Sequence, residues 1–298
     1  MSGAIEKLTY MNERGESITF SRASVYHINF KDVSGLSDIR NAIYSINSMG
    51  QDGDTYLGNR IESRDIEIVG HIKERDKAQI QTLRRRLNHV MNPHYAATLI
   101  YECGDFKRVI GCKVDNAPVY NRQVIFERFT IQLLCPNPFW SEEGITREDI
   151  ALWVGNFEFP VPDGLEIPMI EGWQIGFREP SLIVNVLNRG DVRAGLRVEF
   201  RAIGVVVNPF LLNVDTGEYI KINITMEAGD MLAISTGYGE KAVTFQRNGV
   251  VTDAFRYLDV DSSYLQLAVG DNLFRYDASS NLENLEVSIY HNNYYLGV

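Results

Sequence analysis

The sequence predicts a mainly β protein of two domains. The first is an α+β domain with an antiparallel sheet and one helix, and the second is an antiparallel β-sandwich of the jelly-roll type. Three observations lead to this fold class. The chain has 298 residues, more than one domain usually holds. The first half contains one helical period among alternating apolar and polar segments. The second half is a series of short alternating segments, separated by turn residues about every ten positions.

The boundary between the domains is predicted from the stretch Arg128–Trp140. Its first part alternates as a strand, with Phe129, Ile131, Leu133 and Cys135 on one face. Two prolines, at 136 and 138, then remove backbone donors and end the pairing, and two large aromatic residues follow. We therefore expect an N-terminal domain over residues 1–140, a connector over 141–160 and a sandwich domain over 161–298.

The charge of the chain is uneven across that boundary. The whole sequence carries 29 Lys and Arg against 39 Asp and Glu, a net charge of −10. Residues 1–140 hold 18 basic and 16 acidic side chains, and the remainder holds 11 and 23, so the acidity belongs to the second half. This composition disfavours nucleic acid and anionic membranes as partners. No apolar run approaches a membrane span or a signal peptide, so we expect a soluble protein made in a reducing cytoplasm.

The strands and the helix of the first half follow from their periods. Alternation predicts strands near residues 5–10, 17–20, 26–30 and 64–72, and a hairpin is expected around Gly104-Asp105. The helix is expected to begin at Lys73–Lys77 and to end at Asn92-Pro93. Its run Arg84–Arg86 lies between the apolar positions and has no second basic cluster beside it, so we interpret it as a solvated helix face.

The segment of residues 31–60 is predicted to be a long arm. It is polar, contains glycines at 35, 50, 53 and 58, and shows little periodicity, which is unusual in a compact domain unless the loop has a task. Short strand-like pieces such as Asn41–Ile46 could cover the sheet edge of a neighbouring subunit. The candidate inter-subunit residues in it are Gly50, Asp52, Asp54, Tyr56 and Arg60. Asp52 and Asp54 lack the remaining ligands of a calcium loop.

The second half predicts a sandwich because turn dipeptides punctuate its alternating segments. Turns are expected at Asp215–Glu218, Thr236–Glu240 and Asn248-Gly249, each between two short alternating runs.

No constellation of residues in the sequence indicates catalysis, a metal or a cofactor. The five histidines and three cysteines lack metal-ligand spacing, and no glycine-rich phosphate loop is present. We therefore expect no enzymatic activity, no catalytic or cofactor-binding residues and no metal. A saccharide is the alternative ligand, because Trp153 and Trp173 could stack on a sugar ring, although aromatic residues serve more often in a core or an interface.

Nearly the whole sequence resembles the distal tail proteins of siphophages. The resemblance rests on Val69-Gly70 leading into the helix, on Phe129–Trp140, and on motifs in the second half at Asn185–Asp191, Thr216–Glu218, Gly229–Thr236 and Gly270–Tyr276. It implies a barrel-like, ring-forming N-terminal domain and a galectin-like C-terminal domain. It further implies a structural virion protein that forms a homo-hexameric hub at the tail tip, joining the tail tube protein to the tip, baseplate and host-adsorption proteins. The alternative function is a lectin-like module that contacts a cell-wall saccharide.

Overall fold

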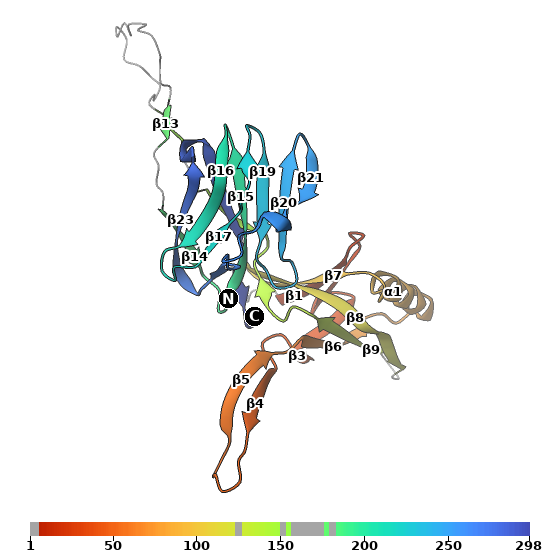
Figure 1. The fold of residues 1–298 in the computed structure, drawn as a ribbon. Helices are drawn as coiled ribbons and strands as arrows, with labels where there is room; N and C mark the ends of the chain where they lie inside the picture. Colours follow the sequence, from red (N-terminus) through yellow and green to blue (C-terminus); the bar gives the residue numbers. More distant parts are fainter. Residues whose placement is uncertain (1–5, 123–126, 150–152, 156–175, 179–182) are drawn as a thin grey trace, which may run out of the picture. The chain divides into compact units, whose positions relative to one another are not determined.

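The computed structural model describes residues 6–122, 127–149, 153–155, 176–178 and 183–298 (Figure 1). The chain divides into two compact units. The first comprises Met1–Glu143 together with Tyr294–Val298, and the second comprises Gly144–Asn293. Each unit has its own sheets, so each is described separately.

The first unit is built on a closed barrel of seven strands. The strands follow the order β8-β7-β1-β2-β3-β6-β9, and pairing between β8 and β9 closes the ring. All neighbours are antiparallel except β2 and β3, which are joined by a short parallel pairing. The strands are β1 (Glu6–Asn12), β2 (Ser17–Ser21), β3 (Tyr26–Ser34), β6 (Arg64–Ile72), β7 (Ala97–Cys103), β8 (Phe106–Arg122) and β9 (Glu127–Cys135).

Strict alternation of the side chains determines which face of each strand lies inside the barrel. Strand β6 pairs with β9 over nine residues, from Arg64 opposite Cys135 to Ile72 opposite Glu127. Every second residue of both strands is buried. Because a shift of one residue would turn the buried side chains to solvent, this register is strongly specified. The rings of Phe20, Tyr26 and Phe129 pack together inside, with centroids 5.9 to 6.4 Å apart.

The single α-helix in the described part of the chain, α1 (Lys77–Val90), packs on the barrel. Its inward residues are Ile80, Leu83, Leu87 and Val90, the positions that the helical period predicted. It begins at Lys77, the last residue of the expected starting run Lys73–Lys77. The reason is the cap: the side chain of Asp76 accepts a hydrogen bond from the backbone N–H of Ala78, which fixes the first turn there.

Three short elements complete the first unit. Strands β4 (Asn41–Ile46) and β5 (Thr55–Ile61) form a separate two-stranded hairpin that projects from the barrel (Figure 1). Beyond the proline stop, β10 (Trp140–Ser141) pairs with β8 and with β25 (Tyr294–Tyr295). The last residues of the chain therefore return to the first unit.

The second unit contains two larger antiparallel sheets whose strands alternate between buried and exposed residues. One sheet runs β11-β24-β15-β19-β20-β21, with β22 beside β15, and the other runs β14-β23-β16-β17, with β18 beside β16. Strands β12 (Trp153–Gly155) and β13 (Gly176–Arg178) pair with each other. The remaining bounds are β11 (Thr146–Asp149), β14 (Ile183–Asn188), β15 (Ala194–Ala202), β16 (Val206–Asn213), β17 (Tyr219–Lys221), β18 (Thr225–Met226), β19 (Met231–Ser235), β20 (Ala242–Arg247), β21 (Val250–Asp253), β22 (Gln266–Leu267), β23 (Gly270–Ser280) and β24 (Leu285–His291), with single 3-10 turns at Phe255–Tyr257 and Leu282–Asn284.

The mainly β fold class with one helix is confirmed, and so are the turns predicted at 215–218, 236–240 and 248–249, each of which joins two paired strands. Two details differ from the domain limits expected from the sequence. Residues Tyr294–Val298, which we placed in the domain 161–298, lie in the first unit because β25 pairs with β10. Part of the expected connector, Thr146–Asp149, forms strand β11 of the second unit, and its residues 150–152 and 156–160 lie outside the described residues.

Candidate functional site

The β4–β5 hairpin is the segment of the first unit with the least support from its own chain. Within the described residues its two strands pair only with each other. Instead of the long loop expected from the sequence, Asn41–Ile61 is thus a ribbon of six pairs with one irregularity after Tyr44. The strand-like piece expected at Asn41–Ile46 is β4, whereas β5 and its pairing with β4 were not predicted, because no face of the ribbon is buried and no period of burial was present to read.

Large apolar side chains of the hairpin are exposed. The relative exposures are 65% for Ile43, 50% for Tyr44, 53% for Ile46, 61% for Tyr56 and 65% for Leu57, and Met49 at the tip is fully exposed. Ile43 and Tyr44 are consecutive, as are Tyr56 and Leu57, and consecutive strand residues point to opposite faces. The ribbon is therefore apolar on both faces. Exposed apolar patches of this kind mark interaction sites on protein surfaces.

The five residues proposed from the sequence all lie in this hairpin. Gly50 adopts a left-handed φ of 81° in the tip turn, where Asp52 is exposed. Asp54 accepts a hydrogen bond from Ser45 Oγ at 3.0 Å, which ties the two strands near the tip. Tyr56 and Arg60 lie on β5, and Arg60 reaches Glu62 at 3.9 Å.

The root of the hairpin, in contrast to its tip, is tightly held by the buried Arg64. This residue is 2% exposed, and its guanidinium donates hydrogen bonds to five backbone carbonyl oxygens. Those carbonyls belong to three separate segments: the loop before β4, the segment after β9 and the C-terminus. They are Gly35 at 2.7 Å, Leu36 at 3.0 Å, Asp38 at 3.1 Å, Pro138 at 2.7 Å and Leu296.

Other contacts reinforce the loop 35–38 that leads into the hairpin. The indole Nε1 of the fully buried Trp140 donates to the Leu36 carbonyl at 3.0 Å. Ser37 Oγ donates to the Val298 carbonyl at 2.6 Å. Gly35 has a left-handed φ of 85°, and a β-carbon there would lie 2.0 Å from the Asp65 carbonyl oxygen. The hairpin is thus an apolar ribbon on a rigid root.

Burial lowers the pKa of Arg64 below its ordinary value, although the nearby Cys135 and Asp38 act in the opposite direction. An arginine remains charged after such a shift. Its charge is met by the dipoles of the converging carbonyl groups, which explains how a guanidinium can be buried at this position. Burial also raises the pKa of the Cys135 thiol to about 12, which makes this cysteine a packing residue.

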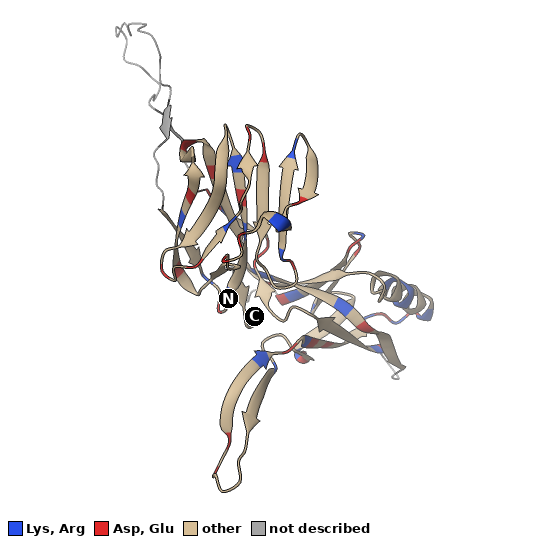
Figure 2. Cartoon of the chain, in the orientation of Figure 1, with Lys and Arg blue, Asp and Glu red and all other residues tan. Residues whose placement is uncertain are grey.

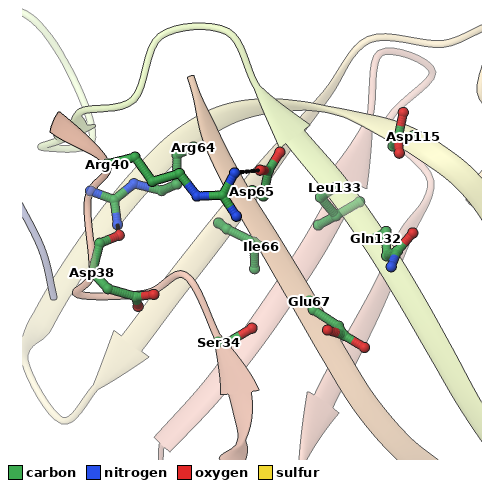
Figure 3. Close-up of a pocket in the computed structure, with 10 residues that line it drawn as sticks. All are labelled: Ser34, Asp38, Arg40, Arg64, Asp65, Ile66, Glu67, Asp115, Gln132 and Leu133. Carbon is green, nitrogen blue, oxygen red and sulfur yellow. Dashed lines mark hydrogen bonds and ion pairs between the residues drawn. The ribbon is translucent and has the colours of Figure 1, made fainter. Parts of the chain in front are cut away.

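A polar cavity of about 370 Å³ opens beside the root (Figure 3). Four carboxylates line it, and the two arginines in its wall are already engaged: Arg40 pairs with Asp65 at 3.1 Å, and Arg64 binds the carbonyl groups described above. The lining residues are Ser34, Asp38, Arg40, Arg64, Asp65, Ile66, Glu67, Asp115, Gln132 and Leu133. This surface is therefore suited to a cationic side chain.

The side chains considered for a saccharide fall outside what the structure describes. The side chain of Trp153, on β12, and the whole of Trp173 lie outside the described residues. Within the described part of the chain, no group of three or more His, Cys, Asp or Glu residues is placed to hold a metal ion. Among the same residues, no helix has both the length and the apolarity that crossing a membrane requires.

Two family models match the chain. Residues 15–135 match the phage tail protein RIFT-related domain, and residues 189–295 match the C-terminal domain of the siphovirus-type tail component. Together the matches cover both units and more than half of the sequence. The chain belongs to the distal tail protein family of siphophages. It is a structural component of the phage tail.

One solved structure shows the same fold. The crystal structure of the Dit protein of phage SPP1, described as a paradigm of the hub adsorption apparatus of phages infecting Gram-positive hosts, is similar with a TM-score of 0.67 and 12% sequence identity, over 96% of this chain and 98% of that one. Two structures of the phage P2 baseplate in its activated conformation, with Ca and with Sr, give TM-scores of 0.49 and 0.48 at 10% identity. They cover 97% and 96% of this chain, and 97% of each matched chain. No curated protein sequence matches the chain.

Arg64 is the site residue that the sequence interpretation missed. It was included in a predicted strand only as its first residue. One signal was present, because Arg64 stands in phase with Ile66, Ile68 and Ile72, the positions of that strand that face the core.

Proposed function

We propose that the protein is the hub of a long non-contractile phage tail. Six copies form a ring through their first units, at the tail tip, between the tail tube and the baseplate or adsorption proteins. The family supports a structural role in the tail, and it gives no reason to expect enzymatic activity. The hairpin carries the proposal, because its strands pair only with each other among the described residues and its large apolar side chains are exposed, so it offers an apolar surface to another subunit.

A ring requires a heterologous interface, in which two different patches of the same chain meet and the rotation closes. The hairpin provides one patch. Its rigid root holds the ribbon in a fixed direction, so that little conformational entropy is lost when the ribbon binds. In this proposal the ribbon lies on the barrel of the next copy, where it buries Ile43, Tyr44, Tyr56 and Leu57.

Apolar-to-polar substitution on the hairpin tests this function. In the full chain, Ile43→Ser with Leu57→Ser should leave both units folded, because neither side chain contacts a core, and should dissociate the ring. The readouts are circular dichroism for folding and light scattering for mass. A matched control is Val250→Ser with Val251→Ser, which exposes two equally accessible apolar residues of the second unit to the same change. A hairpin variant with the mass of the wild-type assembly would remove the ribbon from the interface.

A cell-wall saccharide remains the second candidate ligand from the sequence, and Trp153 and Trp173 are its proposed contacts. A glycan array tests it: selective binding that Trp153→Ala or Trp173→Ala abolishes would support a lectin-like role beside the structural one.

A further inference from the structure

Helix α1 presents an unpartnered basic face. It contains four cationic residues and no carboxylate, and Figure 2 shows it as a concentration of blue on the first unit. Arg84 is used internally: it lies 3.0 Å from Glu127 and its guanidinium carbon is 4.3 Å from the ring centroid of Tyr120. Arg85 and Arg86 are exposed and form no ion pair with any described residue.

The cavity at the hairpin root has the complementary charge. Of its four carboxylates, Asp65 is paired with Arg40, and Asp38 accepts a hydrogen bond from the Gly35 amide at 3.0 Å. Glu67 and Asp115 form no ion pair within the part of the chain that the structure describes. Glu67 stands opposite Gln132 on β9, and Gln132 stands opposite Asn116 on β8. Asp115 is the residue before Asn116 and accepts a hydrogen bond from its side chain at 3.0 Å, and both carboxylates line the cavity.

The two charged surfaces lie at opposite ends of strand β6. Asp65 and Glu67 are near its beginning, and α1 follows its last residue, Ile72, after a short link. Glu67 lies five residues before Ile72, which at about 3.3 Å per residue is a separation of roughly 17 Å. Within one copy, neither Arg85 nor Arg86 forms an ion pair with Glu67 or Asp115. Two different patches of opposite charge at opposite ends of one barrel are what a head-to-tail contact between copies requires.

We propose that the acidic cavity of each copy receives the basic face of α1 from the next copy, the same copy that its own hairpin contacts, with Arg85 and Arg86 of that copy facing Glu67 and Asp115. This inference rests on the ring proposed above and names a second part of its interface. The cavity lies at the root of the hairpin, so the ribbon and the cavity engage the same neighbour. The ribbon supplies apolar burial, and the charge pair sets the direction and the register of the ring.

Charge reversal on each side tests the docking in the full chain. Variant one carries Arg85→Glu and Arg86→Glu, and variant two carries Glu67→Lys and Asp115→Lys. Each variant alone brings like charges together, so each should associate at least tenfold more weakly than the wild type in sedimentation velocity. A control carrying Arg193→Glu and Arg256→Glu makes the same change of net charge on exposed residues of the second unit and should assemble normally.

Mixing the two variants provides the decisive readout. In the mixture, the acidic helix of variant one faces the basic cavity of variant two, and the native charges face each other at the alternate contacts. Assembly of the mixture, with neither variant assembling alone, supports the docking. Variants that failed to assemble because they were misfolded would not assemble when mixed. Variants that assemble like the wild type would overturn this docking and leave the ring intact. A wild type that is monomeric throughout would overturn both.

Discussion

The guanidinium of Arg64 donates a hydrogen bond to the carbonyl oxygen of Leu296, a residue 232 positions later in the chain. The same guanidinium binds the loop at the hairpin root and the carbonyl of Pro138. One buried side chain therefore fastens three distant segments of the first unit.

Replacement of Arg64 by lysine should loosen all three segments together. A lysine keeps the charge but has three donors at one point, so it cannot reach carbonyls on three sides. Leaving buried carbonyl groups unpaired should lower the stability of the first unit by roughly 3 kcal/mol. Hydrogen exchange should report faster exchange at Leu36, Asp38 and the C-terminal residues. Arg60→Lys, on the exposed hairpin, is the control; equal protection in both variants would show that Arg64 is not the fastener.

Removal of residues 294–298 should destabilise the first unit and leave the second unchanged. The truncation deletes the partner strand of β10 and the Leu296 carbonyl, and it removes the stacking of Tyr295 on Arg108, whose guanidinium carbon lies 4.0 Å from the ring centroid. Protection of amides measured by hydrogen exchange should fall at Trp140–Ser141 and at the hairpin root. Loss of protection confined to residues 183–293 would instead make the C-terminus a part of the second unit.

Gly35→Ala should be much more damaging than Gly15→Ala. Both glycines have a left-handed φ, 85° and 79°, so both substitutions carry a backbone cost of about 1 kcal/mol. A β-carbon at Gly15 meets nothing within 4 Å, whereas one at Gly35 meets the Asp65 carbonyl oxygen at 2.0 Å. The difference between the urea denaturation midpoints of the two variants reports the steric clash at Gly35, because the backbone cost is the same in both. Equal midpoints would mean that the root loop yields easily and does not hold the ribbon rigidly.

The first unit should lose stability as pH falls below neutrality, through His71. Burial lowers the pKa of His71 from its ordinary value of 6.5, and the neighbouring His27 and Lys73 lower it further. As pH falls through 6.5, the unfolded chain takes up this proton while the folded chain does not, so the free energy of unfolding decreases until the folded pKa is passed.

The variant His71→Gln should abolish this contribution. Its free energy of unfolding, measured against that of the wild type from pH 7 to pH 5, should rise relative to the wild type as the pH falls. His94→Gln, in the exposed loop after α1, serves as the control. A constant difference between His71→Gln and the wild type over this range would contradict the assigned shift.

The sequence predicted those parts of the fold in which burial alternates along one element. Strand β6, strand β9 and helix α1 each place apolar residues at the period of their own structure, and each lies where it was expected. The hairpin around Gly104-Asp105 was also predicted, and its two strands pair from Cys103 opposite Phe106 outward.

The candidate site was predicted only in location, because its features arise from contacts distant in sequence. The arm was placed in residues 31–60 with a strand-like piece at Asn41–Ile46, but its partner strand β5 was not predicted because both faces of the hairpin are exposed. The role of Arg64 depends on carbonyls of Pro138 and Leu296, which no local pattern links to it. The return of the C-terminus was missed for the same reason, since β25 has only two residues.

The proposed ring is tested most directly by the solution mass of the full chain. Multi-angle light scattering after size exclusion should give six chains of 33.8 kDa, about 200 kDa, at micromolar concentration. Because the ribbon contributes apolar burial, part of this assembly should persist at 0.5 M NaCl, while the rate of association falls with the screening of the charged surfaces. A mass of one chain at every concentration from 1 to 100 μM would contradict the ring, and with it the role assigned to the hairpin.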